Sequence, residues 1–149
     1  MNLHTSSIIT GLKLLYKTEG IGGWFRGVGP APIRTKEGWL VIYHAMDHTN
    51  PDRYRMGALI LDSNDPTKIL HRSDEPILEP EEQYENNGYK WGVIYSCGAV
   101  VKDGNLFVYY GGADMVTCVA VANLDAFLKE LVKKGGAPKL STKTKKKIT

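Results

Sequence analysis

The chain has 149 residues, of which 42% are hydrophobic and 23% charged, a composition typical of a soluble globular protein and not of a disordered or fibrous one. The 19 basic and 16 acidic residues give a net charge of only +3, and five of the lysines lie in the last eleven residues. We therefore expect residues 136–149 to be a basic, disordered tail, and we expect no nucleic-acid partner.

No stretch of the sequence reaches the roughly 18 to 20 consecutive apolar residues that a membrane span needs. The N-terminus also lacks the charged start and apolar run of a signal peptide, so the sequence predicts a cytoplasmic protein with no membrane partner. Cys97 and Cys118 both lie in apolar, strand-like runs, so we expect buried free thiols and no disulfide framework.

The first 26 residues include one segment with helical spacing. Residues 7–17 place apolar side chains on one face behind a possible serine cap, and glycines follow, so the sequence predicts a short amphipathic helix here. The apolar residues are Ile8, Ile9, Leu12, Leu15 and Tyr16.

Six runs after this segment are typical of β-strands because they are short, rich in β-branched and aromatic residues, and separated by turn signals. The Lys102-Asp103-Gly104 sequence predicts a hairpin turn between two of them. The runs are residues 39–46, 55–62, 68–72, 94–101, 105–110 and 115–121.

Residues 73–90 form a polar stretch with two prolines and six acidic residues, which predicts an exposed or functional loop and no core element. A helix is predicted over residues 124–134, with Asn123 as its cap and Gly135 as its stop. Six strands without intervening helices indicate an all-β architecture, and the pattern leaves a sandwich, a barrel and propeller blades open.

Three segments in fixed order decide between these architectures. They are GVGPAPIRTKEGWLVIYHAM at 27–46, YRMGALILD at 54–62, and ILHRSDEPILEPEEQYENNGYKWGVIYSCGAVVKDGNLFVYYGGAD at 69–114. Over residues 27–135 the chain resembles the second half of glycoside hydrolase family 130. The resemblance implies the later blades of a five-bladed β-propeller that ends in the predicted C-terminal helix, with residues 1–26 as an unmatched segment.

The resemblance also implies a function. Family members are inverting phosphorylases that cleave β-mannosides with inorganic phosphate and release α-mannose 1-phosphate, with no cofactor. Three positions of the chain match substrate-binding positions of the family: His44, Tyr54 and Asp114. Without the resemblance, His44 is equally consistent with a core histidine, Tyr54 with strand packing and Asp114 with a turn residue.

Two departures from the family pattern bear on the activity. A family lysine that binds phosphate falls at Phe25, nineteen residues before His44, with Arg26 beside it. Arg26 and His44 are therefore the phosphate-binding candidates, although a strand neighbour of Phe25 points to the opposite face. The family's general acid is an aspartate ahead of the matched region, so no catalytic residue is assigned here.

These departures leave three functions open: a phosphorylase with part of its site on this chain, a mannoside hydrolase, and an inactive carbohydrate-binding or assembly module. A partial propeller exposes blade edges, so we expect a homo-oligomer or a second chain that completes the ring.

Overall fold

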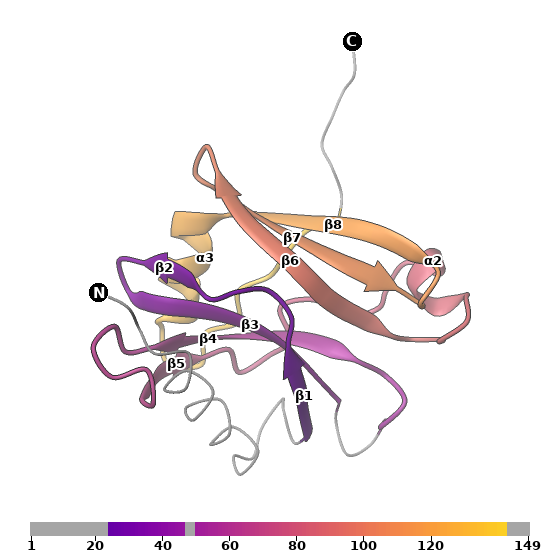
Figure 1. Cartoon of the computed structure of the whole chain (residues 1–149), viewed down its shortest axis with the longest axis horizontal. Coiled ribbons are helices and arrows are strands. Elements are labelled where there is room, and N and C mark those ends of the chain that lie inside the picture. Colours follow the sequence, from indigo (N-terminus) through magenta and orange to yellow (C-terminus); the bar gives the residue numbers. More distant parts are fainter. Residues whose placement is uncertain (1–23, 47–49, 143–149) are drawn as a thin grey trace.

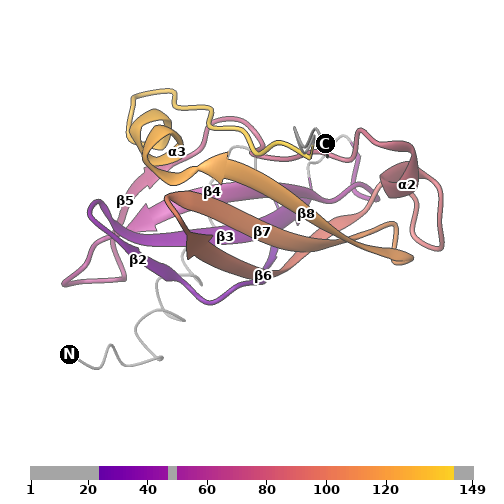
Figure 2. The same cartoon turned by 90° about the horizontal axis from the view of Figure 1, so that it is seen from above.

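The computed structural model describes residues 24–46 and 50–142 of the chain. A five-stranded antiparallel sheet contains β1 (Trp24–Val28), β2 (Ile33–Thr35), β3 (Gly38–Met46), β4 (Arg55–Leu61) and β5 (Ile69–Arg72). A three-stranded antiparallel sheet contains β6 (Ile94–Lys102), β7 (Asn105–Gly112) and β8 (Val116–Asn123). The described helices are α2 (Gln83–Asn86) and α3 (Leu124–Leu131). Figures 1 and 2 show the second sheet stacked on the first, with α2 and α3 at opposite ends of it.

The central strands of the larger sheet are buried on both faces. Nearly every residue of β3 and β4 is buried, as expected from their unbroken apolar sequences. One face of these strands packs against the smaller sheet. The other face carries a second apolar cluster in which Phe25 contacts Tyr43 at a ring-centroid distance of 5.5 Å.

The main core lies between the two sheets and is closed at one end by α3. Apolar residues of β3, β4, β6, β7 and β8 meet there with Phe127, Leu128 and Leu131 of the helix. Asn123 caps the helix, because its side chain accepts a hydrogen bond of 3.0 Å from the Ala126 backbone N–H. The cap confirms the predicted helix start.

The smaller sheet is buried on one face only. Along β7, buried residues alternate with more exposed ones, as expected for a half-buried antiparallel strand. The strand registers place Val100, Phe107, Tyr109 and Val119 together on the exposed side. We call these four residues the open face. Val100 is 47% exposed and Tyr109 is 43% exposed, so this surface is unusually apolar.

The structure confirms the six predicted strands and the mostly β fold, whereas the propeller itself stays a prediction. Strands β1 and β2 were not predicted, because β1 contains a glycine and β2 has only three residues, directly after Pro32. The helix predicted over residues 7–17 lies outside the described residues. Helix α3 ends at Leu131, earlier than predicted. The Lys133 backbone N–H donates a hydrogen bond to the Glu130 carbonyl, three residues before it, so the last turn is tighter than an α-helical turn.

Three expectations about exposure need correction. Ile77 and Leu78, in the loop predicted to hold no core element, are buried in the main core. Cys97 is exposed rather than buried, because it lies at a β-bulge of β6; Cys118 is half-buried, and both thiols are free. The predicted tail packs as far as residue 141: Leu140 is buried in the core, and Ser141 pairs with Val121.

Within the described ranges, no helix is long and apolar enough to cross a membrane.

Candidate functional site

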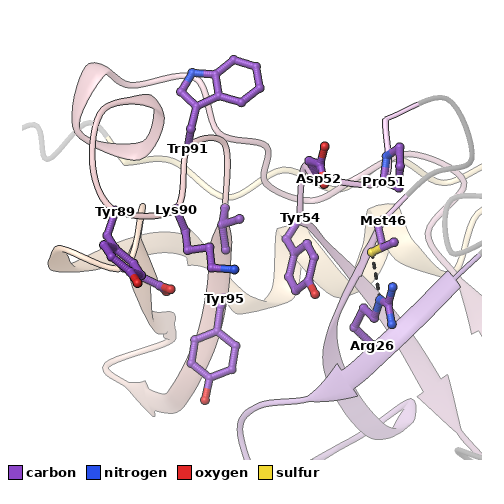
Figure 3. A pocket seen from close by; sticks show the side chains of 11 residues that line it. Arg26, Met46, Pro51, Asp52, Tyr54, Tyr89, Lys90, Trp91 and Tyr95 are labelled. Atoms are coloured by element: carbon purple, nitrogen blue, oxygen red, sulfur yellow. Dashed lines mark hydrogen bonds between the residues drawn. The ribbon is translucent and has the colours of Figure 1, made fainter.

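A pocket of about 780 Å³ opens where β1, the start of β4, the start of β6 and the β7–β8 turn come together. Its volume is in the range of small-molecule binding sites. Figure 3 shows side chains from these separate segments facing one another across the pocket. The lining residues are Arg26, Met46, Pro51, Asp52, Tyr54, Tyr89, Lys90, Trp91, Val93, Tyr95 and Asp114.

The pocket brings together three of the four residues singled out from the sequence, namely Arg26, Tyr54 and Asp114. His44 lies directly behind the wall. Its ring stacks on Tyr54 with centroids 6.0 Å apart and meets the edge of Tyr95 at 5.1 Å. All four predicted positions therefore belong to one region of the structure, although they come from three different parts of the sequence.

Arg26 and Phe25 point to opposite sides of β1. Phe25 is buried with Tyr43 in the second apolar cluster, whereas Arg26 is exposed and lines the pocket. The register of β1 against β3 shifts between Phe25 and Gly27, so a bulge lies at Arg26. The Arg26 Nε donates a hydrogen bond of 2.8 Å to the Met46 sulfur, drawn in Figure 3, which fixes the base of the guanidinium.

His44 is 7% exposed, and burial lowers the pKa of its imidazole below the ordinary value. Its Nδ1 has no hydrogen-bond partner among the described residues. The close approach of β1 is possible because residue 27 is glycine: a Cβ there would lie 3.2 Å from His44 Cε1. The structure therefore holds a neutral imidazole with one unused polar atom against the pocket wall.

Asp114 is presented to the pocket by a tight turn between β7 and β8. Both Ala113 and Asp114 have positive φ, 51° and 54°, and Met115 donates its N–H to the Gly112 carbonyl at 3.0 Å. This is the geometry of a two-residue hairpin turn, in which aspartate is tolerated at positive φ. The Asp114 carboxylate is exposed, so its charge does not carry the free-energy cost of losing its hydration.

One wall of the pocket is a segment that we call the pocket loop, residues 87–93. It is joined to the Asp114 turn by two backbone hydrogen bonds, from Lys90 N–H to the Ala113 carbonyl at 2.9 Å and from Ala113 N–H to the Val93 carbonyl at 2.8 Å. Lys90 extends toward Tyr54 in Figure 3. The loop and the turn therefore place an ammonium group and a carboxylate at the same pocket.

Comparison with known proteins decides the family. The family model of glycoside hydrolase family 130, described as beta-1,4-mannooligosaccharide phosphorylase, matches residues 25–133. The chain belongs to this family. The family 130 match begins within β1 and ends just after α3, so it includes every strand and helix described above except the first residue of β1.

Individual family 130 proteins are similar to the chain over the same region. The 1,2-beta-oligomannan phosphorylase of Thermoanaerobacter sp. is 52% identical over 98 residues, which are 66% of this chain and 32% of that protein. A solved structure of beta-1,2-mannobiose phosphorylase from Listeria innocua, in complex with beta-1,2-mannobiose, matches with a TM-score of 0.65 and 44% identity, covering 70% of this chain and 29% of that one.

Another solved structure is described with the statement that the family of mannoside phosphorylases contains glycoside hydrolases that target beta-1,2-mannosidic linkages in Candida mannan. It is 29% identical with a TM-score of 0.58, over 66% of this chain and 30% of that one. The chain thus spans about a third of the length of the curated relatives it matches.

Several pocket residues of this family 130 chain were missed by the sequence reasoning. Tyr89 and Lys90 lie at the end of the polar stretch that was predicted to be a loop, Trp91 follows it directly, and Tyr95 is the second residue of the next strand. The available signal was three large side chains directly after Asn86-Asn87-Gly88, in a loop otherwise rich in acids. Among the described residues, no group of three or more His, Cys, Asp or Glu could hold a metal ion.

Proposed function

We propose that the chain forms part of the active site of a β-mannoside phosphorylase, in which phosphate attacks the mannosyl anomeric carbon with inversion and gives α-mannose 1-phosphate. The observation that carries the proposal is the convergence of Arg26, Tyr54 and Asp114 on one pocket, with His44 behind it. The names of the relatives, which are phosphorylases of β-1,2- and β-1,4-linked mannosides, support the substrate class.

Asp114 and Tyr54 are the proposed sugar-binding groups. An exposed carboxylate on a rigid turn accepts hydrogen bonds from sugar hydroxyls, and such charge-assisted bonds are among the strongest in proteins. The Tyr54 phenol offers both a donor and an acceptor and is held by its stacking on His44. Together they fix the mannosyl ring relative to the phosphate.

Arg26 and His44 are the proposed phosphate-binding groups. The Arg26 guanidinium lies on the pocket side of β1, where it compensates for Phe25 at the position of the family lysine. The neutral imidazole of His44 has one N–H to donate to a phosphate oxygen. In the reaction, the phosphate oxygen forms a bond to C1 as the glycosidic bond breaks, and the leaving oxygen takes a proton from an acid ahead of the matched region.

Mannoside hydrolysis is the second candidate, and Phe25 is the observation that favours it. Loss of the lysine removes one phosphate-binding charge, and water would then take the place of phosphate as the nucleophile. The description of one solved relative, which states that the family contains mannoside-targeting glycoside hydrolases, supports this alternative. A binding or assembly module without activity is the third outcome.

We propose that the remaining part of the site comes from further polypeptide, either in the same protein or in a second chain, or that copies of this chain associate. The open face, whose apolar residues are half exposed, is a surface for such contacts. The cytoplasmic location, the partial propeller and the domain limit at residue 26 remain predictions, as does the independence from any cofactor.

The test is an activity assay on a reconstituted site. The chain is mixed with the part of the Listeria innocua β-1,2-mannobiose phosphorylase that precedes its matched region, and β-1,2-mannobiose is added with and without phosphate. We expect mannose 1-phosphate only from the mixture, because general acid catalysis contributes about 10²–10⁴-fold. Free mannose formed independently of phosphate would indicate the hydrolase. Mannose 1-phosphate formed by the chain without the added segment would contradict a partial site.

A further inference from the structure

The side chain of Trp91 is exposed but held in place. The Arg53 guanidinium lies over its ring at 5.7 Å from the centroid. Arg53 is itself fixed, because its Nη2 donates a hydrogen bond of 2.6 Å to the Pro80 carbonyl and lies 3.5 Å from the Asn86 side-chain oxygen. A surface tryptophan supported in this way keeps its orientation before any ligand arrives, which lowers the entropy cost of binding.

The backbone of the pocket loop is fixed at the same point. Gly92 has a φ of +69° and donates its N–H to the Glu85 carbonyl at 3.1 Å. On the other side of Trp91, the Lys90 N–H donates to Ala113. Both neighbours of Trp91 are therefore hydrogen-bonded to other parts of the structure, and the ring stands on a rigid segment of the pocket wall.

Three aromatic residues are exposed at this one pocket. Tyr89 is 82% exposed, Trp91 is 56% exposed and Tyr95 is 46% exposed. Several large aromatic side chains exposed together at a concave surface are typical of a binding site. Figure 3 shows the Trp91 ring standing at the outer rim, on the far side of the pocket from Arg26. A ligand that reaches Trp91 therefore extends well beyond the group bound near Arg26.

The flat rings suit one chemical class of ligand. A β-mannosyl unit presents the axial hydrogens of C1, C3 and C5 on one face of its ring, and this apolar face packs on the face of an aromatic side chain. Its hydroxyl groups point sideways, where Lys90 and Asp52 at the same pocket offer a donor and an acceptor. An aromatic rim with polar neighbours thus matches a saccharide better than a purely apolar ligand.

We infer that Trp91 and Tyr89 form a platform for the sugar units that extend out of the pocket, beyond the mannosyl unit next to Tyr54 and Asp114. This inference rests on the proposed function and names the part of the substrate that the platform selects. It makes the chain a binder of mannooligosaccharides with a preference for longer ones, because further units add contacts with the aromatic rings at the rim.

The experiment measures the affinity of the 149-residue chain for β-mannobiose and β-mannotetraose, in both β-1,2 and β-1,4 linkage. Titrations followed by NMR detect weak binding and report on the Trp91 indole N–H directly. We expect the tetraose to bind about five- to tenfold more tightly than the biose in at least one linkage, and to shift the indole signal. Trp91→Ala should abolish this length preference, whereas Trp91→Phe should retain most of it.

Tyr109→Ala is the matched control, because Tyr109 is a similarly exposed aromatic residue on the open face, away from the pocket. Equal affinity for both lengths in both linkages would overturn the platform while leaving the proposed function intact, and so would a length preference that survives Trp91→Ala. If the unaltered chain binds neither saccharide, the platform is overturned, whereas the proposed function is decided separately by the activity of the reconstituted site. If Trp91→Ala does not fold, the indole shift in the unaltered chain decides the question.

Discussion

The Tyr110 hydroxyl donates a hydrogen bond of 2.6 Å to the Glu85 carboxylate, and both side chains are fully buried. The second carboxylate oxygen accepts the backbone N–H groups of Glu81 and Glu82 at 2.8 and 2.9 Å. Burial, together with the neighbouring Glu85, raises the pKa of Tyr110, so the phenol stays protonated and remains a donor. This contact joins the segment before the pocket loop to the middle of the smaller sheet.

Tyr110→Phe should therefore destabilise the protein. The substitution leaves one carboxylate oxygen buried without its donor, which costs about 1–3 kcal/mol of the free energy of unfolding. Tyr109→Phe, at the next position of the same strand, removes an exposed hydroxyl and should change stability by less than about 0.5 kcal/mol. Urea unfolding of the two variants is the measurement, and equal midpoints would show that the buried contact contributes nothing.

Gly57→Ala should destabilise the larger sheet by about 1–3 kcal/mol through overpacking. A Cβ at residue 57 would lie 2.3 Å from Cζ of Tyr43, on the neighbouring strand. The Tyr43 ring cannot easily move away, because its hydroxyl accepts a hydrogen bond of 3.0 Å from Arg72 Nε.

Gly98→Ala is the control for this substitution. At that strand position the nearest atom to a new Cβ is 3.9 Å away, an ordinary contact. Thermal unfolding of both variants should separate them by several degrees. A Gly57→Ala variant as stable as Gly98→Ala would contradict the packing of Tyr43 on Gly57.

His44 should make stability depend on pH. Burial lowers the pKa of His44 below its ordinary value of 6.5, so near pH 6 the unfolded chain binds a proton that the folded chain does not. Stability is therefore full above pH 6.5 and decreases as the pH falls from there toward the lowered pKa. His44→Gln removes this term, so the difference in unfolding free energy between the original protein and the variant should shrink from pH 7 to pH 5. A difference that stays constant over this range would exclude the effect.

The open face should cause the isolated chain to associate. Val119, with 36% of its surface exposed, lies beside Tyr109 across the β7–β8 pairing. Val119→Lys introduces a charge into this apolar surface, beside Tyr109, and should shift the sedimentation profile toward monomer. Gln83→Lys adds the same charge at an exposed position of α2 and should not change the profile. A single monomeric species of the unaltered chain at all concentrations would contradict the prediction.

The strands could be predicted from sequence because their local patterns agree with their burial. The unbroken apolar run of β3 and the alternation of β7 each match the surroundings that the strand meets in the structure. The turn at Asp103 and Gly104 could also be predicted, because aspartate and glycine are residue types that tolerate positive φ. Both residues have positive φ in the structure. In these elements the conformation favoured by the local sequence is the same as the one that tertiary packing requires.

The pocket was only partly predictable, because its walls come from segments whose sequence is dominated by breakers. Ile77 and Leu78 were assigned to a loop, yet tertiary contacts bury them. Glu85 looked like one more acidic loop residue, and nothing local indicates that its carboxylate is buried against Tyr110. Trp91 was missed for the same reason: its role depends on Arg53, thirty-eight residues away in the sequence.

Asp114→Asn should weaken mannoside binding by about 1.5–3 kcal/mol, the usual contribution of hydrogen bonds to a charged group. Asparagine is preferable to alanine here, because Asp114 has a φ of 54° and asparagine tolerates this conformation. The variant therefore removes the charge and keeps the turn. Asp103→Asn is the matched control: Asp103 also has a positive φ, 50°, in a hairpin turn, but it does not line the pocket. Binding of β-mannobiose to the reconstituted site, measured by calorimetry, should fall about tenfold or more only for Asp114→Asn. Equal affinities for the two variants would mean that the Asp114 carboxylate does not contact the sugar.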